Sequence, residues 1–183
     1  MSCCRLESER LLLRPPEPRD VPAIVTWIGD WDVAKNLARC PHPYGETDAQ
    51  EFLLRSAEGR ARGTDFGFAI TRKSDSCYLG QIGLHLKDGM FEVGYWLGKP
   101  FWSQGYASEA ARRALNFAFR DLRAETVWAG WFHDNPASGH VLEKLGCRPN
   151  GQEPRACLAR GHDVLCNLVI LNRADFFGRK MAA

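Results

Sequence analysis

Stretches in which large apolar residues alternate with small or polar ones recur along this chain, and they predict strands. Three of them, Phe66–Arg72, Leu79–Lys87 and Phe91–Leu97, follow one another with a period of two and are separated by short turns. Connections this short favour an antiparallel meander. Two more segments of strand type, Glu125–Phe132 and His162–Leu168, come later in the chain.

Apolar residues spaced three or four positions apart predict helices between these strands. Asp20 is the expected N-cap of the first helix, and Gly146 ends the last. Together with a first strand over Leu6–Arg14, the order is a strand, three helices, three strands, a helix, a strand, a helix and a final strand. This order predicts a mixed sheet flanked by helices, of class α/β or α+β. The predicted helices are Val21–Gly29, Asp32–Ala38, Thr47–Gly59, Gly105–Arg120 and Gly139–Arg148.

One segment, residues 91–110, joins a strand to a helix through a turn of small residues. Gly98-Lys-Pro100 stops the strand, the chain turns on Gly105, and a run of helix formers begins at Ser108. Such a turn directs several free backbone N–H groups at one point, with the positive end of the helix dipole behind them. Ala107 keeps side-chain bulk away from that point. We predict a pyrophosphate site here; the alternative is a plain connection, since short glycine turns are common.

A second strand, polar turn and helix follow further along the chain. The first turn is written Trp102-Ser-Gln-Gly105-Tyr-Ala107, and the second unit Asn135-Pro-Ala-Ser138 followed by Glu143-Lys-Leu-Gly-Cys147. Together they resemble the GNAT acetyltransferase superfamily, whose acyl-CoA pyrophosphate loop is (Gln/Arg)-x-x-Gly-x-(Gly/Ala). The N-terminal segment from Glu7 to Pro15 is similar to the branch that acetylates the alanine or serine N-termini of ribosomal proteins.

The resemblance covers roughly residues 5–175 and implies a single GNAT-like N-acetyltransferase domain, with tails at 1–4 and 176–183. It implies a mostly antiparallel sheet whose middle strands splay apart, acetyl-CoA as cosubstrate, and no metal. The acyl-pantetheine arm is expected to pair with the backbone around Tyr95 and Leu97. The cofactor-binding residues that it implies are Tyr95, Trp96, Leu97, Trp102, Ser103, Gln104, Gly105, Tyr106, Ala107, Ser108 and Asn135.

The chain departs from the family pattern at three positions. Trp102 stands where Gln or Arg is usual, and Ser103 replaces a frequent Gly. A serine needs more conformational energy than a glycine to direct its backbone amide at the phosphates. Neither change removes a backbone donor, and CoA binding is still expected. Many members protonate the departing thiolate with a Tyr at the position that is Leu142 here.

Amide formation from a thioester needs a neutral amine, a polarised carbonyl and a donor for the leaving thiolate. Glu92 suits a base that takes the ammonium proton, or an anchor for the amine; the alternative is a strand-edge glutamate paired with Lys or Arg. Ser138 is expected to contact the thiolate and Asn135 to hold the pantetheine amide. The alternative is that these two residues only cap their helix.

Composition narrows the classes of function. The chain has 183 residues with 45% hydrophobic and 25% charged content, which fits one globular domain. A net charge of +2 is too balanced for non-specific nucleic-acid binding, and no apolar run approaches the roughly 18 residues of a membrane span. Seven cysteines without a Cys-x-x-Cys pair, and an acidic N-terminus unlike a signal peptide, favour reduced thiols in the cytoplasm.

The function expected from these features is transfer of the acetyl group from acetyl-CoA to a primary amine, by direct attack in a ternary complex. The α-amino terminus of a protein or peptide is the acceptor that the branch implies. Acetylation of a small-molecule amine such as an antibiotic, and a non-catalytic acyl-CoA-binding module, stay open as alternatives. Neither nucleic acid nor membrane is an expected partner, and the chain is expected to be a monomer or a homodimer.

Overall fold

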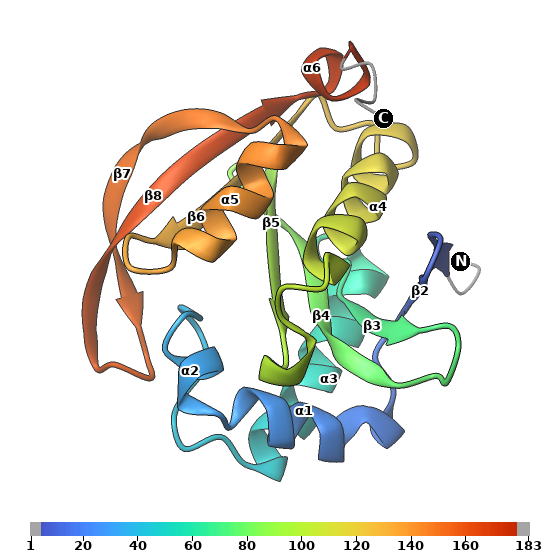
Figure 1. Cartoon of the computed structure of the whole chain (residues 1–183), viewed down its shortest axis with the longest axis vertical. Coiled ribbons are helices and arrows are strands. Elements are labelled where there is room, and N and C mark those ends of the chain that lie inside the picture. The colour runs from blue at the N-terminus through green and yellow to red at the C-terminus, as the bar shows by residue number, and fades with distance from the viewer. Residues whose placement is uncertain (1–4, 179–183) are drawn as a thin grey trace.

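The computed structural model describes residues 5–178, and its centre is one eight-stranded mixed sheet (Figure 1). The strand order is β1-β2-β3-β4-β5-β6-β8-β7, and every neighbouring pair is antiparallel except β5 and β6, which run parallel. The mixed, mostly antiparallel sheet that the sequence predicted is therefore confirmed. The strands are β1 Leu6–Glu7, β2 Leu11–Arg14, β3 Phe68–Arg72, β4 Tyr78–Lys87, β5 Met90–Leu97, β6 Thr126–Phe132, β7 Arg148–Cys157 and β8 His162–Asn172.

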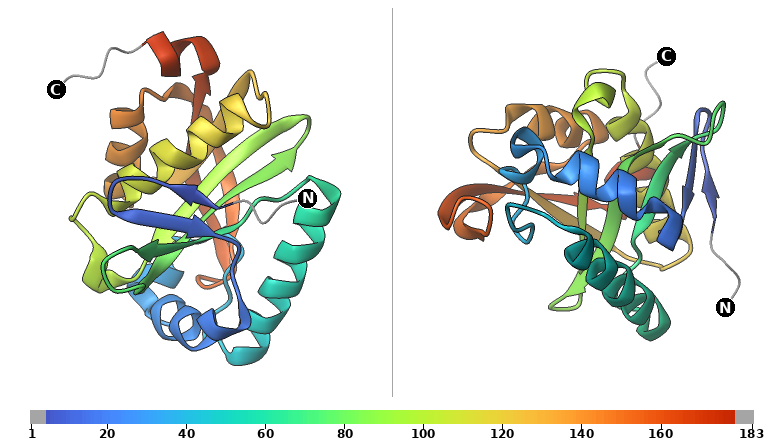
Figure 2. Two further views of the ribbon diagram at one scale, coloured as in Figure 1. Left: turned by 90° about the vertical axis from the view of Figure 1, so that its right-hand side faces the viewer. Right: turned by 90° about the horizontal axis from the view of Figure 1, so that it is seen from below.

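Helices cover both faces of this sheet (Figure 2). On one side α4 packs against β4 and β5 and against α5, while α1 and α3 pack together on the other side. The helix α6 reaches into the range that we expected to be a C-terminal tail; the expected tail at 1–4, with Cys3 and Cys4, lies outside the described residues. The helices are α1 Val21–Ile28, α2 Trp31–Ala34, α3 Glu46–Arg62, α4 Tyr106–Arg120, α5 Pro136–Leu145 and α6 Arg173–Gly178, with short 3-10 turns at Pro18–Asp20 and Lys99–Phe101.

The largest core lies between α4 and the sheet. The buried face of α4 carries small residues, among them Ala110, Ala111, Ala114 and Ala118, all fully buried. Their size lets the helix backbone lie close to the strands, where it meets Leu79, Ile82 and Leu84. This close packing fixes the N-terminus of α4, and with it the turn that precedes the helix.

Several predicted boundaries were wrong: the second helix is Trp31–Ala34 rather than Asp32–Ala38, for example, and three other differences have a local cause. The first strand is broken in two by a turn after Ser8, so that Leu6 pairs with Leu13. The third helix begins at Glu46 with Gly45 as its N-cap, because Asp48 accepts a hydrogen bond from the Gly45 amide. The helix expected at Gly139 begins earlier, at Pro136, a residue type well suited to the first helical position.

The strand β7 was not predicted at all. Its sequence contains Pro149, Gly151 and Pro154, residues that argue against a strand. In the sheet, β7 is the edge strand next to β8, and its pairing is interrupted by a bulge between Pro149 and Gln152. An edge strand needs donors on one side only, so it tolerates prolines that a central strand would not.

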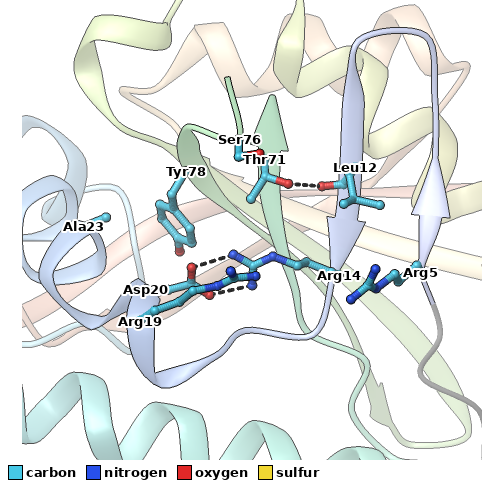
Figure 3. A pocket seen from close by; sticks show the side chains of 9 residues that line it. All are labelled: Arg5, Leu12, Arg14, Arg19, Asp20, Ala23, Thr71, Ser76 and Tyr78. Carbon is cyan, nitrogen blue, oxygen red and sulfur yellow. Dashed lines mark hydrogen bonds and ion pairs between the residues drawn. The ribbon is translucent and has the colours of Figure 1, made fainter. Parts of the chain in front are cut away.

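A buried ion pair holds β2 to the start of α1 (Figure 3). Asp20 is the N-cap residue of α1, as expected, but its carboxylate does not bond a helix amide. It accepts hydrogen bonds from both terminal nitrogens of Arg14 instead, at 2.8 and 2.6 Å. Both residues are buried, at 6% and 3% exposed surface. The pocket around them lies between β2, β3 and α1, and β4 separates it from β5 and β6.

Removing one partner of this pair should destabilise the fold strongly. The variant Asp20→Ala leaves the Arg14 guanidinium buried without its carboxylate, and we expect the free energy of unfolding to fall by about 3–5 kcal/mol. As control, Arg19→Ala removes an exposed pair with Glu17 and should change stability by about 1 kcal/mol or less. Urea denaturation of both variants measures the difference, and equal effects would contradict the structural role of the pair.

Candidate active site

The strands β5 and β6 are hydrogen-bonded neighbours only where they begin. Phe91 pairs with Val127 and Glu92 with Trp128, and no further pair joins these two strands, both of which lie wholly within the described residues. Beyond this point β5 stays paired with β4, and β6 stays paired with β8. The sheet is thus split at its middle, as the family resemblance implied, and one edge of β5 faces the split.

The side chains of β5 point alternately to the two faces of the sheet. Val93, Tyr95 and Leu97 belong to the core beneath α4. Trp96 lies on the opposite face, where its ring is 6.2 Å from that of Tyr78. Glu92 shares the Trp96 face.

The turn after β5 presents backbone amides at the N-terminus of α4. Ser103 (φ 59°) and Gly105 (φ 80°) both adopt left-handed backbone conformations, which glycine takes freely and serine at a cost. Because Gly105 is the N-cap of α4, the first N–H groups of the helix lack intrahelical partners. The turn is also tied to β5, since the indole nitrogen of Trp102 donates to the carbonyl of Leu97 at 2.8 Å.

An arginine that sequence reasoning missed braces this turn. Arg10, from the turn between β1 and β2, donates to the carbonyl of Gln104 at 3.0 Å and to the carboxylate of Glu109 at 2.7 Å. Its guanidinium lies 4.5 Å from the centre of the Tyr106 ring. A cation therefore stands beside the amides. No local pattern could reveal it, because Arg10 is remote from the turn in sequence.

Ser138, in the first turn of α5, is joined to β5 across the split. The hydroxyl of Tyr95 lies 3.0 Å from both the hydroxyl and the carbonyl oxygen of Ser138. Burial raises the pKa of the Tyr95 phenol well above its usual range, so it stays protonated. Asn135 is the N-cap of α5 and accepts a hydrogen bond from the Ser138 amide, as the capping alternative expected. Leu142 is buried in the core.

On the sheet face away from α4, Glu92 is paired with an arginine. Its Oε1 accepts a hydrogen bond from Arg155 of β7 at 2.6 Å, and both side chains are more than four-fifths buried. Arg155 also bonds Glu153 and lies over the ring of Trp128. This is the pairing that the structural alternative for Glu92 required. Because β7 was not predicted, the partner was missed; a role of Glu92 toward an amine stays a prediction.

Comparison with known proteins decides the family. Residues 10–148 match the family described as "Acetyltransferase (GNAT) domain", which is more than half of the chain. The chain belongs to the GNAT acetyltransferase family. The family, the fold class and the activity of an N-acetyltransferase, all expected from the sequence, are thereby confirmed.

Individual relatives agree with this assignment. The chain is 26% identical to the uncharacterized N-acetyltransferase YnaD of Bacillus subtilis, an alignment that covers 86% of this chain and 90% of YnaD. Mycobacterium smegmatis RimJ, solved with CoA-disulfide, shares its fold with a TM-score of 0.80 at 18% identity, covering 97% and 94% of the two chains. The microcin C7 self-immunity acetyltransferase MccE, solved with acetyl-CoA and AMP, does so with a TM-score of 0.79 at 16% identity, covering 90% and 93%.

On this GNAT fold the predicted site residues fall into three groups. The turn from Trp102 to Ser108 lies at the N-terminus of α4. Tyr95, Ser138 and Asn135 meet on the side of the sheet that α4 and α5 cover. Glu92 and Trp96 lie on the other face, so they do not contact the Ser138 group.

Other kinds of site find little support in the described part of the chain. Burial raises the pKa of the Cys40 thiol to about 12, and it also raises that of Cys166, which makes both poor nucleophiles. Between residues 5 and 178 no three His, Cys, Asp or Glu side chains come together as metal ligands would. Within the same range no helix has the length and apolar character needed to cross a bilayer.

Proposed function

We propose that this GNAT protein transfers the acetyl group of acetyl-CoA to the α-amino terminus of a protein or peptide, by direct attack in a ternary complex. The observation that carries the proposal is the split between β5 and β6. It opens beside the amide-rich turn, with Ser138 on one face of the sheet and Glu92 on the other. The acyl donor would lie between β5 and β6 in this split, and the acceptor would reach it from the face that carries Glu92.

The phosphates of acetyl-CoA would bind at the turn formed by residues 103–108. Its support is the set of unpaired N–H groups at the start of α4, the helix dipole behind them and the Arg10 cation beside them. The RimJ and MccE structures, which share this fold, were solved with CoA-disulfide and acetyl-CoA respectively. Asn135, at the entrance of α5, would hold an amide of the pantetheine arm.

The pantetheine arm would lie along the free edge of β5, from Val93 to Leu97. That edge has lost its strand partner after Glu92, and an extended chain with amide groups can supply the missing hydrogen bonds. Tyr95, Trp96 and Leu97 contribute backbone rather than side chains to this contact. A backbone N–H on the same edge would also polarise the thioester carbonyl.

The chemical step then needs three proton and charge movements. The acceptor loses a proton on the Glu92 face, its nitrogen forms the new bond to the acetyl carbon, and the carbon–sulfur bond breaks. The sulfur leaves as a thiolate toward Ser138, whose hydroxyl donates a hydrogen bond to it, and the second proton released by the acceptor nitrogen ends on the sulfur. Tyr95 holds that hydroxyl in place from β5. The products are an N-acetylated amine, CoA and one proton.

The acceptor class is supported by the similarity of the N-terminal segment to the ribosomal branch, and by a structure of the same fold described as RimL, a ribosomal L7/L12 alpha-N-protein acetyltransferase. MccE, described as a self-immunity acetyltransferase, shares the fold as well. A small-molecule amine is therefore the second candidate. Both candidates use the same donor site, and they differ only in what occupies the Glu92 face.

Acetyl-CoA turnover with peptides that begin with Ala or Ser, and with a panel of small amines, tests the proposal. We expect peptide acetylation by the wild-type chain. The variant Gly105→Asp places a carboxylate against the phosphates, and we expect acetyl-CoA affinity to fall by about 10²-fold or more. Calorimetry measures this loss directly.

The matched control for that variant is Gly63→Asp. Gly63 has the same left-handed backbone (φ 73°) with open space around it, but it ends α3, away from the turn. It reports the strain of the substitution alone. Equal acetyl-CoA affinity in both variants would contradict a phosphate site at the turn formed by residues 103–108. Acetylation of small amines alone would make a small-molecule amine the acceptor.

The variant Ser138→Ala should lower kcat by about 10²-fold while leaving acetyl-CoA affinity nearly unchanged, because the charge on sulfur develops only as the bond breaks. Tyr95→Phe removes the same hydrogen bond between β5 and α5 but keeps the serine hydroxyl, so it reports the contribution of this bond to stability, about 1 kcal/mol. Melting temperature and kcat are measured on both. A Ser138→Ala protein with undiminished kcat would leave thiolate protonation to solvent.

A further inference from the structure

A row of polar side chains crosses the sheet on the face opposite α4. Asp65 is paired with His85 in a bridge beside β3, His85 is paired with Glu92, and Glu92 with Trp128. Directly paired residues project to the same face, about 5 Å apart. The row therefore brings an imidazole next to Glu92, at the place where β5 and β6 separate.

Asp65 orients the imidazole of His85. The Oδ2 atom of Asp65 lies 2.7 Å from Nδ1 of His85. Since an ionised carboxylate only accepts, this contact places the proton of a neutral imidazole on Nδ1 and leaves Nε2 as a proton acceptor. Gly59 of α3 fits against the Cβ atom of Asp65, where a larger residue would not, and so fixes the carboxylate.

The Nε2 atom of His85 lies over a part of the sheet that consists of two paired glycines. A methyl group built on Gly83 would lie 2.8 Å from Nε2 of His85, so the ring extends over this residue. Gly83 is paired with Gly94, the second residue after Glu92, and a methyl group built there would meet nothing within 4 Å. Gly94 lies on the stretch of β5 that faces the split. The ring of His85 thus extends toward the stretch of β5 that borders the split.

Glu92 is less suited than His85 to carry the proton away. Its carboxylate is held by Arg155 at 2.6 Å, whereas among residues 5–178 no Lys or Arg is hydrogen-bonded to Nε2 of His85. The His85 side chain keeps 29% of its surface exposed, so a proton can pass on to solvent, while Glu92 keeps 16%.

We propose that His85, oriented by Asp65, is the base that accepts the proton of the acceptor ammonium, while Glu92 anchors that ammonium. This proposal rests on the proposed function. The proton moves from the ammonium to Nε2, directly or through one water, and from there to solvent after the product leaves. The amine nitrogen, now neutral, uses its electron pair to form the bond to the acetyl carbon.

The pH dependence of kcat/KM distinguishes this base. The charged groups that face His85 are Asp65 at its Nδ1, Glu92 across the strand pair, Lys87 two residues along β4 and Arg155 on Glu92. With the Ser- or Ala-initiated peptide as acceptor, we expect kcat/KM of the wild type to fall on the acid side of its pH profile, because a protonated base cannot accept the ammonium proton. In His85→Gln this limb should vanish and kcat/KM fall by about 10²-fold. Glu92→Gln should instead raise KM and retain the limb.

Two further variants separate chemistry from folding. His85→Ala leaves room beside Gly83, and added imidazole should restore part of its rate, which no structural role would allow. Asp65→Asn can donate to Nδ1 and favours the wrong tautomer, so its kcat/KM should also fall. The control His162→Gln changes an exposed histidine at the start of β8 and should leave the profile intact.

Calorimetry with acetyl-CoA confirms that each variant is folded. A His85→Gln enzyme with wild-type kcat/KM and the same acid limb would overturn the proposal and leave peptide acetylation standing. A wild-type chain that binds acetyl-CoA but acetylates neither peptides nor small amines would instead overturn the proposed function, and this proposal with it.

Discussion

A strand edge left unpaired inside a sheet is the constraint on which the rest of this structure depends. After Glu92 and Trp128, β5 is bonded only to β4 and β6 only to β8. Backbone N–H and C=O groups that stay unpaired away from water are costly, so the open edge of β5 favours a ligand with amides in an extended arm. Close packing of the alanine face of α4 places the turn to which we assign the phosphates at the same opening.

The two faces of the split sheet carry different kinds of polar groups, uncharged on one face and charged on the other. On the α4 side, Tyr95 and Ser138 bridge the opening, and we propose that their hydroxyl pair faces the departing sulfur. On the other side, charged groups gather around Glu92, and the Asp65–His85 pair stands next to it. Charge is thus kept where an ammonium ion would arrive, and uncharged donors are kept where a thiolate would leave.

Features fixed by local chain geometry were predictable, and those that depend on tertiary pairing were not. The turn at Gly105 and the C-cap at Gly146 follow from residue types at set spacing, and the structure has both. Arg155 was missed because its strand contains prolines that only an edge position tolerates. Arg10 and His85 had no local signal, since their partners come from distant segments.

Hydrogen exchange of the backbone amides, with and without acetyl-CoA, tests the central claim most directly. If the cofactor completes the open edge of β5 and occupies the turn, exchange should slow over Val93–Leu97 and over residues 103–108. The pocket around Arg14, which β4 separates from the split, should exchange as before. Bound acetyl-CoA that slows exchange elsewhere and leaves both segments unchanged would contradict the account.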